Sequence, residues 1–378
     1  MKTILLTSGR IPASLELARA LYQQGHRIIV AESLKTHLCL HSKAVAQCHY
    51  VRAPGADELG FREDILRLVR IEKVDLILPM CEEAIYLSRL LPMLPDSCEL
   101  FCKDYALMRQ VHSKWEFIEL AKALRLPVPK TTLVRTRKLS PRFQKKGYVV
   151  KPVFSRSGQG VYIQDPGTPM PPDVNYEDRP WILQERLLGN QYCTFSIAHH
   201  GKVISTVIYK TRVRLGFIGA CFQKVEHRKV TQWIEKFVKG TNWHGFVSFD
   251  FIEGQDQRVY AIECNPRITS GIHVMEPEKL AQSVMEPASV SPEGAFKPSR
   301  AMVAMAMITS FPAMLTRPQN WPAFISEMVR CRDVIFSLRD PIPAIHQFRC
   351  YLEYMQVSFR KNIALKDVIS HEIEYQET

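Results

Sequence analysis

The sequence predicts an α/β domain at the N-terminus, followed by a larger α+β region. Between residues 3 and 32, a strand (TILLTS), a helix and a second strand (RIIVAE) follow one another. This alternation is typical of a βαβ unit with a parallel sheet. Beyond residue 180, short turns join apolar strands directly, as in the hairpin FVSFDFIEGQDQRVYAIE. The change of pattern indicates at least two domains of different architecture.

The composition is that of a folded protein with two or three lobes. The chain has 378 residues, of which 46% are apolar and 23% are charged. Its apolar runs are too short to span a bilayer, and the start MKTILLTSGR is too briefly apolar for a signal peptide. The ten cysteines show no paired zinc spacing, so we expect reduced thiols in a cytoplasmic protein.

The chain is basic, with a formal net charge of +12 and a pI near 9.2. Such a charge suits a nucleic acid, an anionic membrane surface or a phosphate-rich ligand. The sequence has no long basic run and no RNA-binding signature, so a nucleic acid is not an expected partner.

Residues 1–112 are predicted to form a small doubly wound α/β domain. After the βαβ opening, the pattern indicates a helix from about Asp64 to Glu72, the strand DLILPM and a helix that begins near Glu82. The first turn, TSGRIPAS, departs from the G-x-G-x-x-G pattern, so the sequence does not support a dinucleotide site.

A hairpin from Phe246 onward carries the strongest candidate site. Asp250 on its first strand and Glu263 and Asn265 on its second are predicted to converge, because alternating side chains share a face. Two carboxylates and an amide suit Mg²⁺, and Arg267 supplies a fork for an anionic oxygen. The alternative is that these are ordinary strand-end charges beside an Asn-Pro turn, but an unpaired carboxylate inside an apolar strand is costly.

Two lysines occupy unusual positions. Ser113 is predicted to cap a helix whose first turn contains Lys114, where the cation opposes the helix dipole unless an anion is near. The stretch GYVVKPVFSRSGQGVYI places Lys151 inside a strand, with Gly158 and Gly160 in the loop that follows. Backbone N–H groups of such a loop can approach phosphate. The alternatives are a solvated surface lysine and a plain hairpin.

In their order and spacing, these elements resemble the ATP-grasp superfamily of carboxylate ligases over residues 1 to about 275. The acid with E-x-N and the following arginine resembles its magnesium and phosphate site, and V-K-P followed by G-x-G-V resembles its second lysine and mobile lid. The resemblance implies a pre-ATP-grasp domain (1–112), two α+β subdomains that clasp ATP (113–183 with the lid, 184–310 with the metal site) and a basic, mostly helical extension (311–378).

The resemblance also implies ATP and Mg²⁺ as cofactors, with Mn²⁺ as an alternative ion. The metal ligands would be Asp250, Glu263 and Asn265; many members carry the first acid at the place of Ser248, whereas the D-alanine:D-alanine ligase branch has it at that of Asp250. Gln191 stands where the family usually has a ribose-binding Glu. ATP would contact Lys114, Lys151, Ser157, Gly158, Gly160, Gln184, Glu185, Leu187, Leu188 and Gln191.

The implied reaction is that of a carboxylate–amine ligase. ATP would phosphorylate a carboxylate, an amine would attack the acyl phosphate, and ADP and phosphate would be released. Lys151 and Arg267 would act as catalytic residues. Arg212 and Arg214, expected on one strand face, and Ser270, Gly271 and His273 are candidates for contacting amino-acid-like carboxylate and amine substrates. The sequence leaves open whether the protein forms a homodimer.

Three other readings remain. The first is an enzyme that activates bicarbonate, in the manner of biotin carboxylase or carbamoyl-phosphate synthase. The second is a nucleotide-binding regulatory module without turnover, and the third is a nucleic-acid binder with steep salt dependence. The run AMVAMAMI from Ala301 fits a strand or a helix. The stretch YLEYMQVSFRKNIALKDVISHEIEY predicts an amphipathic helix that docks on the core, a partner or an anionic membrane.

Overall fold

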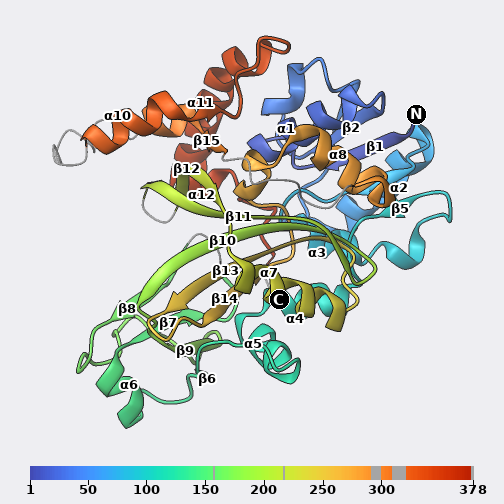
Figure 1. Ribbon diagram of the computed structural model, residues 1–378. Coiled ribbons are helices and arrows are strands. Elements are labelled where there is room, and N and C mark those ends of the chain that lie inside the picture. Colours follow the sequence, from blue (N-terminus) through green and yellow to red (C-terminus); the bar gives the residue numbers. More distant parts are fainter. Residues whose placement is uncertain (156–157, 216–217, 291–298, 309–320, 376–378) are drawn as a thin grey trace.

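The computed structural model describes residues 1–155, 158–215, 218–290, 299–308 and 321–375 (Figure 1). Its N-terminal part is the predicted α/β domain, built on a parallel sheet with the strand order β3-β2-β1-β4-β5. The strands are β1 (Thr3–Thr7), β2 (Arg27–Glu32), β3 (Gln47–Tyr50), β4 (Leu76–Leu78) and β5 (Glu99–Leu100). The helices are α1 (Pro12–Gln23), α2 (Glu58–Glu72) and α3 (Glu83–Ser88), with short 3₁₀ turns at Leu38–His41 and Leu91–Met93.

Helix α2 begins six residues before the predicted start. The side chain of Asp57 caps it by accepting a hydrogen bond from the backbone N–H of Gly60 at 2.8 Å. In its first turn Leu59 is exposed and Gly60 is a weak helix former, so the apolar periodicity that marked the helix in the sequence starts later than the helix itself. The predicted helix near Glu82 is confirmed as α3.

A second, smaller sheet has the order β6-β9-β7-β8, with all neighbours antiparallel. Helices α4 (Tyr105–His112) and α5 (Lys114–Ala123) lead into it, and α6 (Pro141–Lys146) precedes its central strand. The predicted cap of α5 is confirmed, because Ser113 Oγ accepts from the N–H of Glu116 at 3.2 Å. The strands are β6 (Thr131–Leu133), β7 (Tyr148–Pro152), β8 (Tyr162–Gln164) and β9 (Trp181–Glu185).

The largest sheet has seven strands in the order β14-β13-β10-β11-β12-β15-β16 and crosses the middle of the molecule (Figure 1). Helix α7 (Arg228–Gly240) packs on it, with Trp233 and Phe237 against Phe249 at ring-centroid distances of 5.2 and 5.0 Å. The strands are β10 (Gly189–His199), β11 (Lys202–Leu215), β12 (Ile218–Val225), β13 (Gly245–Gly254), β14 (Val259–Asn265), β15 (Arg300–Met302) and β16 (Arg332–Asp333). A 3₁₀ turn, η3 (Ser270–Val274), helix α8 (Pro277–Met285) and a second turn (Pro287–Ser289) follow β14.

The C-terminal region contains α10 (Trp321–Arg330), α11 (Ile342–Lys361) and α12 (Leu365–Val368). The prediction of one continuous amphipathic helix is therefore only partly right. Helix α11 ends because Asn362 adopts a left-handed conformation with φ of 50°, which asparagine tolerates better than most residues. The apolar run from Ala301 continues β15 and then becomes helical at residues 304–308. In the part of the chain that the structure describes, no helix is long and apolar enough to cross a membrane.

The C-terminal region docks on the core, which was one of the three predicted alternatives. Asp340 accepts hydrogen bonds from Arg19 Nε at 2.9 Å and from Ser42 Oγ at 2.6 Å. Further on, the backbone N–H of Gly55 donates to the carbonyl of Glu372 at 2.7 Å, and a Cβ at residue 55 would lie only 2.9 Å from that oxygen. Only glycine lets the two backbones approach so closely.

Candidate functional site

The predicted hairpin brings its two acids side by side. Strands β13 and β14 pair so that Asp250 lies opposite Glu263 and Ser248 lies opposite Asn265. Directly opposed residues of an antiparallel pair project to the same face, so the two carboxylates are neighbours. Ser248 itself is buried, and it donates to the carbonyl of Arg267 at 3.1 Å. Asp250 is therefore the acid that this face presents beside Glu263.

The two carboxylates have opposite protonation tendencies. Burial, and then repulsion from Glu263, raise the pKa of Asp250. Burial also opposes ionisation of Glu263, but the positive charges of Lys114 and Lys151 outweigh it and hold the pKa of Glu263 below its ordinary value. Without a metal ion, the pair of carboxyl groups thus favours one proton and one negative charge. Hard oxygen donors in this state are suited to a divalent ion such as Mg²⁺.

Asn265 and Arg267 extend the site toward the N-terminal domain. Asn265 Nδ2 donates to Glu263 at 3.4 Å, and Arg267 Nη2 donates to Asn265 Oδ1 at 3.2 Å. The same guanidinium group lies 3.4 Å from the carboxylate of Glu82, which is only 2% exposed. His112 is buried beside these charges, and burial lowers its pKa to about 4, so this imidazole is neutral near pH 7.

Both predicted lysines face the acids from the other side. Lys114 Nζ lies 4.0 Å from Glu263 Oε2 and donates to the carbonyl of Ser155 at 2.5 Å, while Lys151 Nζ donates to the carbonyl of Ile262 at 3.2 Å. Each lysine is 5% exposed, so neither is a solvated surface lysine. Burial lowers the pKa of Lys151, Glu263 opposes this effect and Lys114 adds to it, and the resulting pKa is about 8. The site therefore lies between the small and the large sheet.

The glycine-rich loop has the backbone that glycine allows. Gly158 and Gly160 have φ angles of 72° and 66°, a region that other L-residues rarely adopt. A Cβ on Gly160 would also lie 3.0 Å from Pro152 Cγ. Gln159 Nε2 donates to Asp367 at 3.0 Å and so connects the loop to α12. Ser157, another predicted ATP contact, lies outside the described residues.

The predicted adenine-binding segment leaves the small sheet at its last strand. Gln184 is buried and donates to Thr131 Oγ1 of β6 at 3.0 Å, and Glu185 accepts from Arg142 of α6, so both side chains already have partners. Leu187 and Leu188 lie between β9 and β10, where they connect the small sheet to the large one. Gln191, in β10, accepts a hydrogen bond from Arg214 Nη2 at 2.8 Å.

The two arginines expected to form a clamp have different partners. Arg214 contacts Gln191 and is near enough to Asp250 for its charge to lower the pKa of that acid, although burial dominates. Arg212 instead lies 3.4 Å from Glu327 of α10. The register of β11 shifts on both sides of Val213, and such bulges redirect neighbouring side chains. The structure therefore brings Arg214, but not Arg212, to the carboxylate pair.

The remaining candidates lie in η3, where the chain packs against the N-terminal domain. His273 is 3% exposed; its ring contacts Glu16 of α1, and its carbonyl accepts from Arg332 Nη2 at 2.8 Å. Gly271 approaches β10 so closely that a Cβ there would lie 2.5 Å from the Cβ of Phe195. Ser270 begins the same turn. Glu16 lies 257 positions from His273 in the chain, so no local pattern reveals this partner.

Sequence comparison identifies the central part of the chain. The family described as ATP-grasp domain matches residues 111–271, a range that contains both lysines, the glycine-rich loop and the β13–β14 hairpin. A comparison with curated protein sequences finds no match.

Comparison with solved structures extends the likeness beyond that range. The N5-carboxyaminoimidazole synthetase of Staphylococcus aureus, complexed with ADP, is 13% identical with a TM-score of 0.62, over 83% of this chain and 86% of that one. The biotin carboxylase of Campylobacter jejuni is 13% identical with a TM-score of 0.60, over 80% of this chain and 75% of that one. The L-amino acid ligase of Bacillus licheniformis is 14% identical with a TM-score of 0.59, over 80% of this chain and 80% of that one. These structures share the fold of this chain, whose residues 111–271 match the ATP-grasp domain family.

Proposed function

We propose that the protein is an ATP-dependent, ADP-forming carboxylate–amine ligase. In this reaction the γ-phosphoryl group of ATP passes to a substrate carboxylate, and an amine then attacks the acyl phosphate to form an amide with release of phosphate. The observation that carries the proposal is the approach of two buried lysines, Lys114 and Lys151, to the paired acids Asp250 and Glu263 between the two sheets.

This arrangement matches the requirements of phosphoryl transfer. The reaction depends chiefly on positioning and on neutralising charge, rather than on covalent chemistry by the protein. Lys114 and Lys151 offer two ammonium groups to phosphate oxygens, and the backbone N–H groups around Gly158 and Gly160 can cover those oxygens. We assign Ser157 to the same loop on sequence grounds. Phosphate anions would also relieve the repulsion that Lys114 exerts on Lys151.

The carboxylate pair and Asn265 would hold Mg²⁺, for which Mn²⁺ has similar ligand preferences. When bound, the ion supplies positive charge that neutralises phosphate oxygens. Asp250 and Glu263 would have to lose the proton that they share before both could ligate the ion. Asn265 presents a carbonyl oxygen that also accepts from Arg267, and this contact fixes the direction of the guanidinium group.

Arg267 is the proposed stabiliser of negative charge on the acyl group. Its guanidinium is held by Asn265 and Glu82, and its side chain is 16% exposed. A preoriented donor of this kind needs no rearrangement when charge develops on a substrate oxygen. Glu82 positions Arg267 rather than reacting itself. The acceptor substrate would then lie between the large sheet and the N-terminal domain.

For the base and ribose, we propose main-chain recognition. The side chains of Gln184 and Glu185 have partners in β6 and α6, so the backbone of residues 185–188 is the better candidate for contacting the adenine edge. Gln191 can donate and accept hydrogen bonds with ribose hydroxyls, and its contact with Arg214 orients the amide.

A second candidate function is activation of bicarbonate. It is favoured by the likeness to a biotin carboxylase and an N5-carboxyaminoimidazole synthetase, whose TM-scores of 0.60 and 0.62 are close to the 0.59 of the amino acid ligase. Phosphorylation of bicarbonate would use the same lysines and acids. ADP formation that depends on bicarbonate, and not on another carboxylate, would establish this alternative.

The test is to incubate the protein with magnesium-ATP, hydroxylamine and a pool of amino acids and small carboxylates, and to measure ADP and hydroxamate together. We expect equal amounts of the two products, because hydroxylamine traps an acyl phosphate. Glu263→Gln should abolish both, while Glu278→Gln, on the exposed surface of α8, should leave both unchanged. ATP binding without ADP formation from any pool would instead support a regulatory module.

A further inference from the structure

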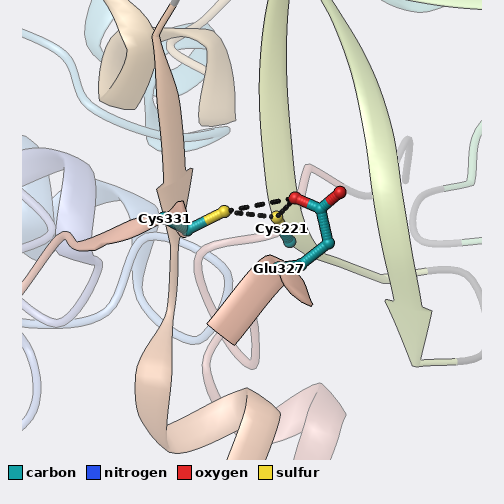
Figure 2. A group of neighbouring side chains, drawn as sticks. All are labelled: Cys221, Glu327 and Cys331. Carbon is teal, nitrogen blue, oxygen red and sulfur yellow. Dashed lines mark hydrogen bonds between the residues drawn. The ribbon is translucent and has the colours of Figure 1, made fainter. Parts of the chain in front are cut away.

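A second group of chemically reactive side chains lies away from the ATP site. Cys221 of β12, Glu327 of α10 and Cys331, which follows α10, point toward one another (Figure 2). The two sulfur atoms are 2.9 Å apart, and Glu327 Oε2 lies 3.6 Å from Cys221 Sγ and 3.5 Å from Cys331 Sγ. The exposed fractions are 0% for Cys221, 8% for Cys331 and 6% for Glu327.

The fold fixes this approach although the cysteines are 110 positions apart in the chain. Cys221 pairs with Met302 of β15, and the next residue along β15, Ala301, pairs with Arg332 of β16. Cys331 is thus tied to the sheet through the residue that follows it. Both cysteines belong to one apolar cluster with Ala220, Met302, Met307 and Phe324.

The distances argue against a metal centre at this place. A tetrahedral Zn²⁺ ion with bonds of about 2.3 Å would hold two thiolates roughly 3.8 Å apart, well beyond the observed separation. Arg300 Nη1 also donates to both oxygens of Glu327 at 2.9 Å, and Arg212 lies 3.4 Å away. A cation on that carboxylate would meet these positive charges. Among the described residues the group offers three ligands, one fewer than a structural zinc site uses.

We propose that Cys221 and Cys331 form a dithiol that a peroxide converts to an intramolecular disulfide. Cys331, the more exposed thiol, loses its proton, with Glu327 beside it as acceptor, and its sulfur attacks the O–O bond. This gives S–OH and releases hydroxide, which takes up that proton as water. The sulfur of Cys221 then displaces the oxygen, and its own proton leaves with it as a second water. Two thiols and one hydrogen peroxide thus yield one disulfide and two waters.

The sulfur atoms need to close by only about 0.9 Å to reach the disulfide bond length. The bond would join β12 to the junction of α10 and β16, and so would fasten the C-terminal region to the large sheet. Cys48 Sγ, by contrast, approaches the carbonyl oxygen of Cys39, at 4.0 Å. This oxidation does not involve ATP turnover, so the result of its test does not depend on whether the proposed function is correct.

The test is a thiol count on the folded, reduced protein before and after treatment with hydrogen peroxide. After quenching, the protein is unfolded and alkylated, and its peptides are mapped by mass. We expect ten alkylated cysteines before oxidation and eight after it, with one linked peptide pair that contains Cys221 and Cys331 and is lighter by two hydrogen atoms. Ten remaining thiols, or a loss spread over other cysteines, would overturn the proposal.

Variants and zinc sharpen the result. Cys331→Ser should keep all nine of its thiols, whereas Cys350→Ser, which removes another buried cysteine, should still lose two. Because the wild-type count carries the test, a variant that fails to fold does not decide it. Zn²⁺ added alone to the reduced protein should not slow the oxidation. One tightly bound zinc that protects both thiols would show a metal site instead.

Discussion

Two clusters of buried charge differ in how their charges are arranged. Glu16, His273 and Arg332 join α1 to the large sheet, and each ionised group there meets an opposite or polar partner. In the candidate ATP site, Asp250 lies beside Glu263, and Lys114 lies near enough to Lys151 to lower its pKa. In the first cluster opposite charges are paired, whereas in the second two carboxyl groups are neighbours and so are two lysines.

The difference supports the proposal that the second cluster binds a ligand. Burial opposes ionisation of Glu16, yet His273 and Arg332 hold its pKa below its ordinary value, as in a completed ion pair. Asp250 has a raised pKa and Lys151 a lowered one, so the site disfavours the charged form of each of these two groups. A metal ion and phosphate would provide charges of opposite sign. Both clusters are buried, so burial does not distinguish them, whereas the directions of their pKa shifts do.

The largest effect is expected from Glu263→Gln. This change removes a carboxylate that faces both lysines, so ADP formation should fall by roughly 100- to 1,000-fold, the usual cost of losing a main electrostatic group. The change also leaves two buried lysines without this carboxylate, so the variant should unfold at a lower temperature, and its ADP formation is measured well below that temperature. Steady-state ADP release is the measurement. Turnover within a few-fold of wild type would mean that this cluster is not the reaction centre.

Glu16→Gln should have the reverse effect. Removing one partner of a buried ion cluster costs about 3–5 kcal/mol of unfolding free energy, while ADP formation at low temperature should stay near that of wild type. The pKa of Glu16 is lowered by folding, so its contribution is present above the ordinary carboxyl value of 4.5 and is lost as pH falls through the folded pKa. Denaturant titrations across that range should show a larger loss of stability in acid for wild type than for the variant.

Lys151→Met tests the cationic half of the site. Folding lowers the pKa of Lys151 from 10.5 to about 8, so the unfolded chain binds more protons between these values and wild-type stability rises with pH there. The rise should amount to about 3 kcal/mol in wild type and should be absent from the variant. Denaturant titrations from pH 7.5 to 10.5 measure it, and a parallel rise in both proteins would contradict the assigned cause. The variant should also lose ADP formation.

The smallest effect is expected on thermal stability when Mg²⁺ is added without nucleotide. The ion must displace the proton held by Asp250 and Glu263, so it should stabilise the fold more at pH 8 than at pH 6. At concentrations near the dissociation constant the gain is below about 1 kcal/mol, a thermal shift of a degree or two. Asp250→Asn should remove the pH dependence. A shift equal at both pH values in wild type would argue against the carboxylate pair as the ligand.

Local patterns predicted much of this structure, because the relevant contacts lie within a few residues of one another. The alternation of Asp250 with its neighbours and the turn after Gly254 determine the hairpin, and the register places Glu263 opposite Asp250. Ser113 marks the start of α5 with Lys114 in its first turn. In each case the periodicity of apolar residues, together with one turn or one capping residue, is sufficient to predict the element.

Distant partners could not be predicted in the same way. Glu82 reaches Arg267 from another domain, and Glu16 reaches His273, because the fold brings remote segments together and no spacing records it. Arg212 and Arg214 were expected to act together, but the bulges in β11 separate them. Such bulges depend on pairing with neighbouring strands, which a single strand's alternation does not reveal.

The most direct test of the central claim is a calorimetric titration with Mg²⁺ and a non-hydrolysable ATP analogue. Wild-type protein and Glu16→Gln should bind one analogue per chain with similar affinity, on the order of micromolar. Glu263→Gln and Lys151→Met should bind it at least ten-fold more weakly. If wild type does not bind, or if the Glu263 variant binds as well as wild type, the cluster of like charges between the two sheets is not the ATP site.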